Sequence, residues 1–567
     1  MKRRNFLKKI GFAAGAPIAF QGVPLKLLAG HEEVQRIAQQ STNDRVLVIL
    51  QLHGGNDGLN TIIPISNYDE YYSRRANIAI PYKVGNRTLI PLDSTVASEE
   101  QVGLHPDMND FKRLYDTGKA AVFQGVSYEK NNGSHFRGRD IWFMGGDADD
   151  YFSSGWIGRY LGTEYDPLTY PADFPTEAMP DPLALEMGND VSLLFHQEGN
   201  IPTSISLGSS PGNLANLIDQ LEGFADEGVD PRGNPPEFLN SSPYGQEMNW
   251  ILGLEDKSEV YIRRLAEIYD SAADTTVTYP ETYPFNAPEG SRRNPLSSQL
   301  QLVARLLAGG VKTKVFLVKI GGFDTHASQV ESYDPTMGVH SALLYHISSA
   351  MAAFQKDLRS RGIEDRVLTM SMSEFGRRVG SNGSYGSDHG TGGPVMMFGL
   401  GVKPGIYGTV PDVSQSNVGM QFDYRQIYAN VLYEWMGVEQ SVISNDIFFR
   451  DFIEGANPEG GNYEPMDLIK EVILGEKEQL RKNYRMESVY PNPASNYTQA
   501  KIFVNNYQDV NVQLINVRGN VVAQTNRRVA PGEHTFSFTL DSMSPGFYFI
   551  KAKSEMLDDT KRLIIRK

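Results

Sequence analysis

The central part of the chain alternates between continuous apolar runs and amphipathic stretches. The apolar runs are typical of strands that are buried on both faces, and they lie at 45–52, 120–125, 313–320, 366–372 and 394–399. The stretches between them predict helices at 104–118, 297–307 and 338–361. Strand–helix–strand repetition of this kind predicts an α/β domain, a three-layer sandwich with a mostly parallel central sheet.

A different pattern begins near residue 487. Short alternating runs are separated by turn residues about every 8–12 positions, the spacing of a small antiparallel sandwich. They lie at 499–504, 510–516, 520–525, 534–540, 546–551 and 561–566. The pattern predicts a small all-β sandwich over 487–567, and a carbohydrate-binding or adhesion module has the same periodicity.

The N-terminus resembles an export signal. Its first nine residues carry five basic side chains and no acid, and a weakly apolar run follows at 10–20. That run is shorter than the roughly 20 residues that a membrane span needs, so a signal peptide over 1–30 is expected rather than an anchor. Arg3 and Arg4 resemble the pair of a twin-arginine signal. The alternative is the amphipathic start of a cytosolic helix.

Composition narrows the class of protein. The chain has 567 residues, 53 Lys+Arg and 68 Asp+Glu, a net charge of −15 that argues against general nucleic-acid binding. It contains no Cys, which excludes disulfides, thiolate metal sites and cysteine nucleophiles. We expect an α/β domain over 42–480, with an insert at about 165–290, between the export signal and the 487–567 sandwich. No later run is apolar for long enough to form a stable membrane span.

Candidate chemistry follows the predicted strands. In α/β sheets, ligands bind beyond the carboxyl ends of the strands. The segments there carry oxygen and nitrogen donors, namely Asp57, Asp324, His326, Glu374, Asp388 and His389. Carboxylates and imidazoles at one sheet edge are what a divalent metal site needs, and the absence of Cys leaves zinc, manganese, calcium or magnesium.

Each of these motifs also has a structural explanation. The glycine-rich segment before Asp57 is typical of a tight turn. Glu374 is also placed to form an ion pair with Arg377 or Arg378. Ser134 begins a candidate helix over 134–144, where serine is a preferred N-cap. A hydroxyl at a helix N-terminus also lies where a phosphate or sulfate binds well.

Together the motifs resemble a known family. The segments Leu50–Asn60, Ser134–Phe136, Gly322–His326, Ser373–Arg377 and Asp388–Gly390 resemble the bacterial family called domain of unknown function 1501, over roughly 45–437. That family is similar to the alkaline phosphatase and sulfatase superfamily, whose members hydrolyse phosphate or sulfate esters with one or two divalent metals.

The resemblance implies roles for particular residues. It assigns metal binding to Asp57, Asp324, His326, Glu374 and His389, and the nucleophile to Ser134. The chain departs from the superfamily in its Asp-x-His spacing, in Ser373-Glu374 where a second Asp-His pair is usual, and in lacking the sulfatase cysteine.

The C-terminal segment resembles a secretion module. Val489–Pro493 and Pro545–Lys551 resemble landmarks of the type IX secretion system sorting domain, which implies passage through the periplasm to the cell surface or outside. Export machinery would then be a partner at both ends of the chain.

We therefore expect a secreted metal-dependent hydrolase of phosphate or sulfate esters. In this interpretation Ser134 attacks the ester and Arg377 or His135 holds its anionic oxygens. The substrate would be an anionic ester, possibly on a glycan, and the insert would cover the site. The alternative is a non-catalytic surface-binding protein, possibly glycan-binding, on the same fold.

Overall fold

The computed structural model describes most of the chain. The described residues are 44–567 without 167, 177–178, 189–190, 200, 208–259, 459, 471–483, 506, 517–519 and 555–556, together with the strands β1 (Ala19–Phe20) and β2 (Val23–Pro24). Most of the predicted export signal therefore lies outside the described residues. The chain divides into two compact units, Met1–Lys470 and Glu471–Lys567. Where the structure is described, it contains no helix with the length and apolarity to cross a membrane.

A nine-stranded sheet forms the centre of the first unit. Its strand order is β13-β10-β14-β3-β15-β18-β9-β19, and β20 also pairs with β9. All neighbouring pairs are parallel except those that involve β18, which runs antiparallel to both β15 and β9. In chain order the strands are β3 (Val46–Leu52), β9 (Ala120–Ser127), β10 (Ala184–Met187), β13 (Ser204–Leu207), β14 (Val315–Ile320), β15 (Val367–Met372), β18 (Gly393–Phe398), β19 (Gly405–Tyr407) and β20 (Phe422–Asp423).

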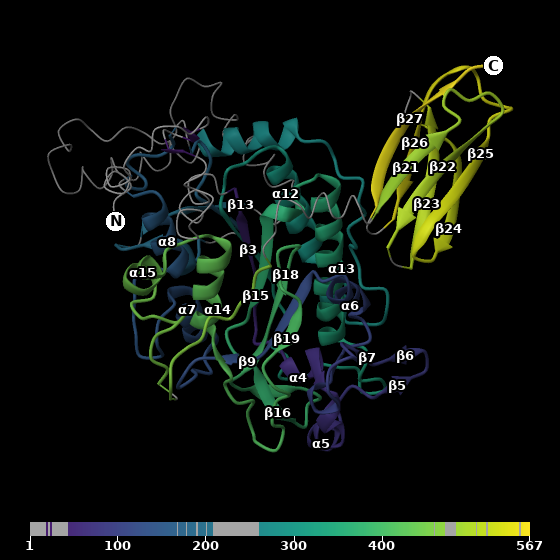
Figure 1. The fold of residues 1–567 in the computed structure, drawn as a ribbon. Coiled ribbons are helices and arrows are strands. Elements are labelled where there is room, and N and C mark those ends of the chain that lie inside the picture. Colours follow the sequence, from purple (N-terminus) through teal and green to yellow (C-terminus); the bar gives the residue numbers. More distant parts are fainter. Residues whose placement is uncertain are drawn as a thin grey trace, which may run out of the picture. The chain divides into compact units, whose positions relative to one another are not determined.

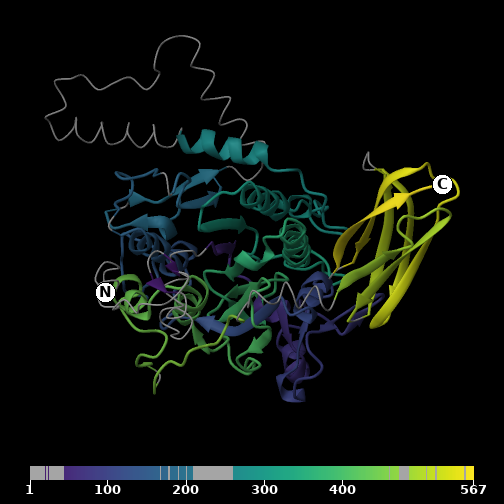
Figure 2. The same ribbon diagram turned by 45° about the horizontal axis from the view of Figure 1, so that its top comes forward.

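Helices cover both faces of this sheet (Figure 1). One face carries α6 (Asn109–Asp116), α12 (Pro295–Ala308) and α13 (Val339–Ser360). The other carries α7 (His135–Met144), α8 (Trp156–Glu164) and α14 (Tyr424–Asn430). Figure 2 shows the sheet and its helices from a second direction. The three-layer α/β prediction is confirmed.

Strand β3 shows why its apolar run is continuous. Val46, Val48, Leu50 and Leu52 belong to the core beneath α12 and α13. The residues between them, such as Leu47 and Ile49, belong to the opposite core beneath α7 and α14. Because successive side chains point to opposite faces of a sheet, a strand covered on both sides needs apolar residues at every position.

The segment predicted as an insert also builds the sheet. Strands β10 and β13 lie within it and extend the sheet on the outer side of β14. The segment's part at 208–259 lies outside the described residues.

Smaller elements surround this framework. The minor strands are β4 (Ile62–Pro64), β5 (Lys83–Val84), β6 (Arg87–Thr88), β7 (Ile90–Pro91), β8 (Val102–Leu104), β11 (His196–Gln197), β12 (Ile201–Pro202), β16 (Arg377–Ser381) and β17 (Ser387–His389). The short helices are α4 (Gly58–Thr61), α5 (Tyr68–Arg74), α11 (Glu289–Arg292) and α15 (Gln440–Val442). The hairpin β16–β17 contains Arg377 and His389, two of the predicted site residues.

The second unit is an antiparallel sandwich. One sheet pairs β21 (Arg485–Tyr490), β22 (Tyr497–Val504) and β25 (Gly532–Thr539). The other has the order β24-β23-β26-β27, built from β23 (Gln508–Asn516), β24 (Val521–Val529), β26 (Gly546–Lys553) and β27 (Asp558–Ile565). Alternating residues such as Val510, Val512 and Leu514 are buried in its core. The predicted all-β fold of this segment is confirmed.

The direction of β18 decides which loops meet. Gly393, the first residue of β18, pairs with Val126 near the carboxyl end of β9. The hairpin that precedes β18 therefore lies at the same edge as the loops that follow β3, β14 and β15. In a fully parallel sheet, the segment before a strand would lie at the opposite edge.

Candidate metal centre

Tight loops bring three strand ends together. Gly54, in the loop after β3, has a φ of +124°, and a Cβ there would lie 2.2 Å from the backbone nitrogen of Asp324. Only glycine allows the β3 and β14 loops to approach so closely. The β3 loop also forms a bridge from Asn56 to Gly376, in the loop after β15.

Three side chains from distant segments converge at this edge. One donor atom each from His135, Asp324 and His389 lies within 4.8 Å of the others. His135 Nε2 is 3.3 Å from Asp324 Oδ2, and His389 Nε2 is 3.4 Å from Asp324 Oδ1. Two ligands of one tetrahedral zinc ion, each about 2.0–2.1 Å from it, lie roughly 3.3 Å apart. The two distances are compatible with a shared metal ion.

His326 lies next to this group. Its Nε2 is 3.3 Å from Asp324 Oδ1 and 2.8 Å from His389 Nε2. The Asp-x-His spacing thus brings both of its side chains to one point, as the sequence predicts for residues two apart at a strand end.

Each imidazole has an acceptor at its other nitrogen. Nδ1 of His135 is 2.9 Å from Glu374 Oε1, and Nδ1 of His389 is 2.7 Å from the Gly133 carbonyl oxygen. Nδ1 of His326 faces Asp388 Oδ1 at 3.4 Å. Because a carbonyl or carboxylate only accepts, the hydrogen bonds of His135 and His389 favour a hydrogen on Nδ1, and in the neutral imidazole the lone pair is then on Nε2. A histidine held in this way by an outer acceptor is the usual arrangement around a bound metal.

The Nε2 atoms of these histidines face one another and the Asp324 carboxylate. Nε2 of His135 is buried and has no hydrogen-bond partner among the described residues. Partial burial lowers the pKa of His389, which favours the neutral form that ligates metals. The donor set therefore fits a divalent cation, and imidazole suits zinc and similar ions better than calcium or magnesium.

Arg377 holds the carboxylate of this group. Its Nη2 donates to Asp324 Oδ1 at 2.7 Å and to the Gly54 carbonyl at 2.8 Å, and its Nε donates to the Gly55 carbonyl at 2.7 Å. Nη1 donates to the carbonyl of Ser387. Partial burial would raise the pKa of Asp324, but the hydrogen bond and the charge of Arg377 lower it below its ordinary value. Asp324 is therefore ionised at neutral pH.

Asp57 lies elsewhere. Its carboxylate is fully buried and accepts two hydrogen bonds from Arg75 Nη1, at 2.8 and 2.9 Å. Gln329 Nε2 donates to its Oδ2 at 2.6 Å. Burial would raise the pKa of Asp57, but the charges of Arg75 and His340 and these hydrogen bonds lower it. The structure places the Asp57 carboxylate in a buried ion pair, not within the His135–Asp324–His389 group.

The other predicted site residues surround the group. Glu374 is buried and lies behind His135, where its Oε1 also accepts from the Gly54 N–H at 2.8 Å. Asp388 lies behind His326. Ser134 is the exposed N-cap of α7, with its hydroxyl 3.5 Å from the backbone nitrogen of Arg137. Glu374 and Asp388 thus orient histidines, and Ser134 directly follows the carbonyl that binds His389.

Sequence reasoning gave one member of the group a different role. His135 was expected to hold substrate oxygens, whereas the structure places it among the donor atoms. The signal for it was the order Gly133-Ser134-His135, which puts a histidine in the first turn of a helix at the sheet edge. His53 also lies near, with Nδ1 3.5 Å from Glu374 Oε1.

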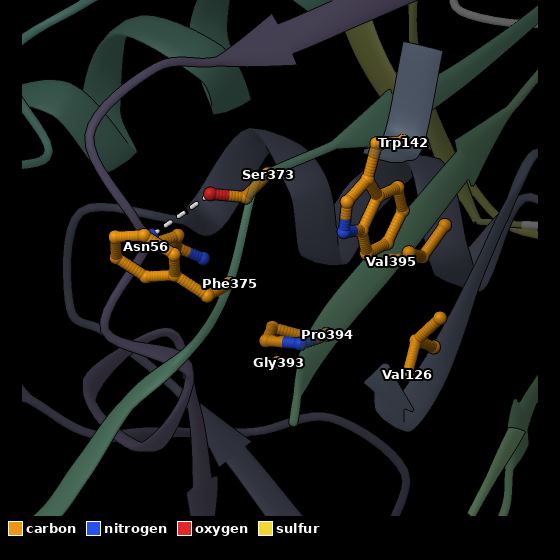
Figure 3. A pocket seen from close by; sticks show the side chains of 8 residues that line it. All are labelled: Asn56, Val126, Trp142, Ser373, Phe375, Gly393, Pro394 and Val395. Atoms are coloured by element: carbon orange, nitrogen blue, oxygen red, sulfur yellow. Dashed lines mark hydrogen bonds between the residues drawn. The ribbon is translucent and has the colours of Figure 1, made fainter. Parts of the chain in front are cut away.

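A small cavity lies beside Phe375 (Figure 3). Phe375 lines it and also packs against the rings of His135 and His389, at 4.9 and 4.4 Å between centroids. Two buried donors border it without a partner among the described residues, Asn56 Nδ2 and Trp142 Nε1. The cavity has a volume of about 10 Å³, enough for about one water molecule.

The fold and the site define the class of protein. It is an α/β protein with a cluster of imidazoles and a carboxylate at one sheet edge, followed by a separate β-sandwich. Residues 262–445 match the family described as "Protein of unknown function (DUF1501)". Residues 488–566 match the family described as "Secretion system C-terminal sorting domain". Both family resemblances are confirmed for these segments, and the chain is a secreted protein with a type IX sorting domain.

Several solved structures resemble the chain weakly. They include a protein in the alkaline phosphatase superfamily from Vibrio parahaemolyticus, with 10% identity over 88% of this chain and 81% of that one, at a TM-score of 0.27. A sulfatase from Pseudoalteromonas sp. has 12% identity over 90% and 87%, at a TM-score of 0.30. Alkaline phosphatase from the Antarctic bacterium TAB5 has 11% identity over 70% and 99%, at a TM-score of 0.27.

Other similarity is more restricted. A β-glucosidase from Listeria innocua matches over 15% of this chain and 16% of its own length, at a TM-score of 0.12. No curated protein matches the chain. TM-scores in this range do not assign an activity to the protein.

Proposed function

We propose that the protein is an exported, metal-dependent hydrolase of phosphate or sulfate esters. The observation that carries the proposal is the convergence of the Nε2 atoms of His135, His326 and His389 on Asp324, each with its Nδ1 opposite an acceptor. The side chains of Asp324 and His326 are about half exposed, so a substrate could reach this group from solvent.

The donor group would hold one divalent ion, with zinc as a good match to two imidazoles and a carboxylate. When bound, this ion would polarise an ester oxygen as a Lewis acid. Arg377 keeps Asp324 ionised and correctly turned. Since four of its five N–H groups already donate within the protein, Arg377 serves the site by positioning and not by gripping the substrate.

Ser134 is the proposed nucleophile. It is exposed, it begins α7, and the carbonyl just before it binds His389. In this reaction its Oγ forms a bond to phosphorus or sulfur, the bond to the leaving alkoxide breaks on the opposite side, and the serine proton passes to that alkoxide. Water then cleaves the bond to Oγ, which releases phosphate or sulfate and restores the hydroxyl. The first-turn N–H groups of α7 would favour the anionic part of the ester.

The test combines metal analysis with an ester panel. Purified mature protein should contain metal in stoichiometric amount and hydrolyse a nitrophenyl phosphate or sulfate. Ser134→Ala should abolish turnover and keep the metal, whereas Ser73→Ala, an exposed serine on α5, should change neither. Absence of bound metal would contradict the proposal. Metal without hydrolysis of either ester would favour the binding-protein alternative.

A further inference from the structure

We propose that Gln329 is a positioning residue for the metal centre, a role that rests on the proposed function. Gln329 lies between β14 and α13 and is completely buried. Its side chain contacts none of the donor atoms of the His135–Asp324–His389 group. Instead, its amide joins three of the loops from which the site is built.

The amide makes three hydrogen bonds, one to each loop. Its Nε2 donates to Asp57 Oδ2, in the β3 loop, at 2.6 Å. Its Oε1 accepts from Thr325 Oγ1, in the loop after β14, at 2.9 Å. The same Oε1 accepts from Ser387 Oγ, at the start of β17, at 3.0 Å.

The positions of these three partners connect the Gln329 amide to the segments that supply the donor atoms. Thr325 lies between Asp324 and His326 in the chain. Its hydrogen bond to Gln329 therefore holds the backbone between these two residues in place. Ser387 lies two residues before His389. Gln329 therefore ties the loop that supplies Asp324 and His326 to the hairpin that supplies His389. A second link between the same loops is the Ser387 N–H bond to the Thr325 carbonyl, at 3.2 Å.

The orientation of the amide is determined by its surroundings. A carboxylate can only accept, so the NH₂ group of Gln329 must face Asp57 and its oxygen must face the two hydroxyls. Asp57 is itself held by the buried guanidinium of Arg75. The buried Arg75–Asp57 ion pair thus fixes the position of the carboxylate to which Gln329 donates.

Loss of these bonds should loosen the donors without removing any of them. Metal sites tolerate ligand displacements of only about 0.2 Å. Changing an outer residue that orients ligands typically weakens metal binding by about 10–100-fold. Gln329 acts one contact further out, so we expect the lower end of this range, about tenfold.

The experiment measures zinc affinity by titration calorimetry of the full-length mature protein. Gln329→Met keeps the length of the side chain and removes all three hydrogen bonds. The matched control is Gln299→Met: Gln299 is also buried and makes three hydrogen bonds, to Pro295 and Lys319, outside the ligand loops. The unfolding midpoint of each metal-free variant is measured alongside.

A purely structural role predicts that both variants lose stability and keep their zinc affinity. The positioning role predicts a weaker affinity, by about tenfold, in Gln329→Met alone. Unchanged affinity in folded Gln329→Met overturns this inference and leaves the proposed function intact. Absence of zinc binding in the wild type overturns both.

A second variant covers the case in which Gln329→Met fails to fold. Thr325→Val keeps the shape of the side chain and removes only its hydroxyl, which contacts Gln329 Oε1 and the Phe323 carbonyl. A weaker zinc affinity in this variant supports the inference. Affinity equal to that of the wild type overturns it.

Discussion

Replacing Arg75 with methionine tests whether Asp57 forms a structural ion pair with Arg75 or binds the metal. Arg75 and Asp57 both have fully buried side chains, and one guanidinium nitrogen contacts both carboxylate oxygens. Arg75 also donates to the carbonyls of Val379 and Arg378, at 2.8 and 2.7 Å. In Arg75→Met the Asp57 charge would be buried without its cation.

The expected cost is large. Removing one partner of a buried ion pair typically costs about 3–5 kcal/mol. The two orphaned carbonyls add roughly 1 kcal/mol each, which puts the total at about 5–7 kcal/mol. With an unfolding entropy of about 2.1 cal/mol/K per residue over roughly 400 residues, the midpoint of thermal unfolding should fall by about 6–8 °C.

The loss should depend on pH in a definite direction. In the wild type the pKa of Asp57 is lowered, so its contribution is present above the unfolded value of about 3.9 and is lost as pH falls through the folded value. Without Arg75, burial should instead raise the pKa of Asp57. The deficit of Arg75→Met should then be largest at about pH 8 and shrink towards about pH 5, where protonation relieves the buried charge.

Differential scanning calorimetry at the two pH values, with zinc stoichiometry as a second readout, tests this reasoning. The double variant Arg75→Met/Asp57→Asn should be more stable than Arg75→Met, because it buries no lone charge. At saturating zinc, both variants should keep the metal. A midpoint within about 1 °C of the wild type, or loss of metal from the folded double variant, would refute the structural role of Asp57.

Three further predictions concern the centre and the cavity beside Phe375. His389→Ala should weaken zinc binding by more than about 100-fold, beyond the effect of an outer residue, and calorimetry showing unchanged affinity would exclude His389 as a ligand. Glu374→Gln should weaken zinc binding by about 10–100-fold, because its amide holds the His135 Nδ1–H less strongly than a carboxylate does; wild-type affinity would contradict this. A crystal structure should show one water between Asn56 Nδ2 and Trp142 Nε1. Trp142→Phe should lose this water, and chemical denaturation should show a free energy of unfolding lower by about 1 kcal/mol. A dry cavity together with an unchanged denaturation midpoint would contradict this prediction.

The elements were predictable because their signals are local. The strand predicted at 45–52 is β3 (Val46–Leu52), and the helix predicted at 338–361 is α13 (Val339–Ser360). Both follow from the spacing of apolar residues, which each segment carries in its own sequence. The segments with chemistry were found in the same way, by looking beyond the ends of predicted strands.

Individual roles at the site were harder to predict. Asp57 and His389 looked equally suited to bind metal. Asp57 instead pairs with Arg75, 18 positions away on the far side of a helix, and nothing in the local pattern around Asp57 marks that partner. His135 and Glu374 lie 239 positions apart, and only their contact turns the imidazole towards Asp324.

The sequence by itself determined the strands, the helices, the change to a β-sandwich near residue 487 and the segments that carry donor atoms. Each of these follows from the spacing of residues within a few turns of helix or a few strands. The tertiary structure alone decided which donors meet, through the reversed direction of β18 and the pairing of buried charges. The physical reason is that a side chain's role depends on which acceptor or counter-charge lies within about 3 Å of it, and that neighbour comes from a distant part of the chain.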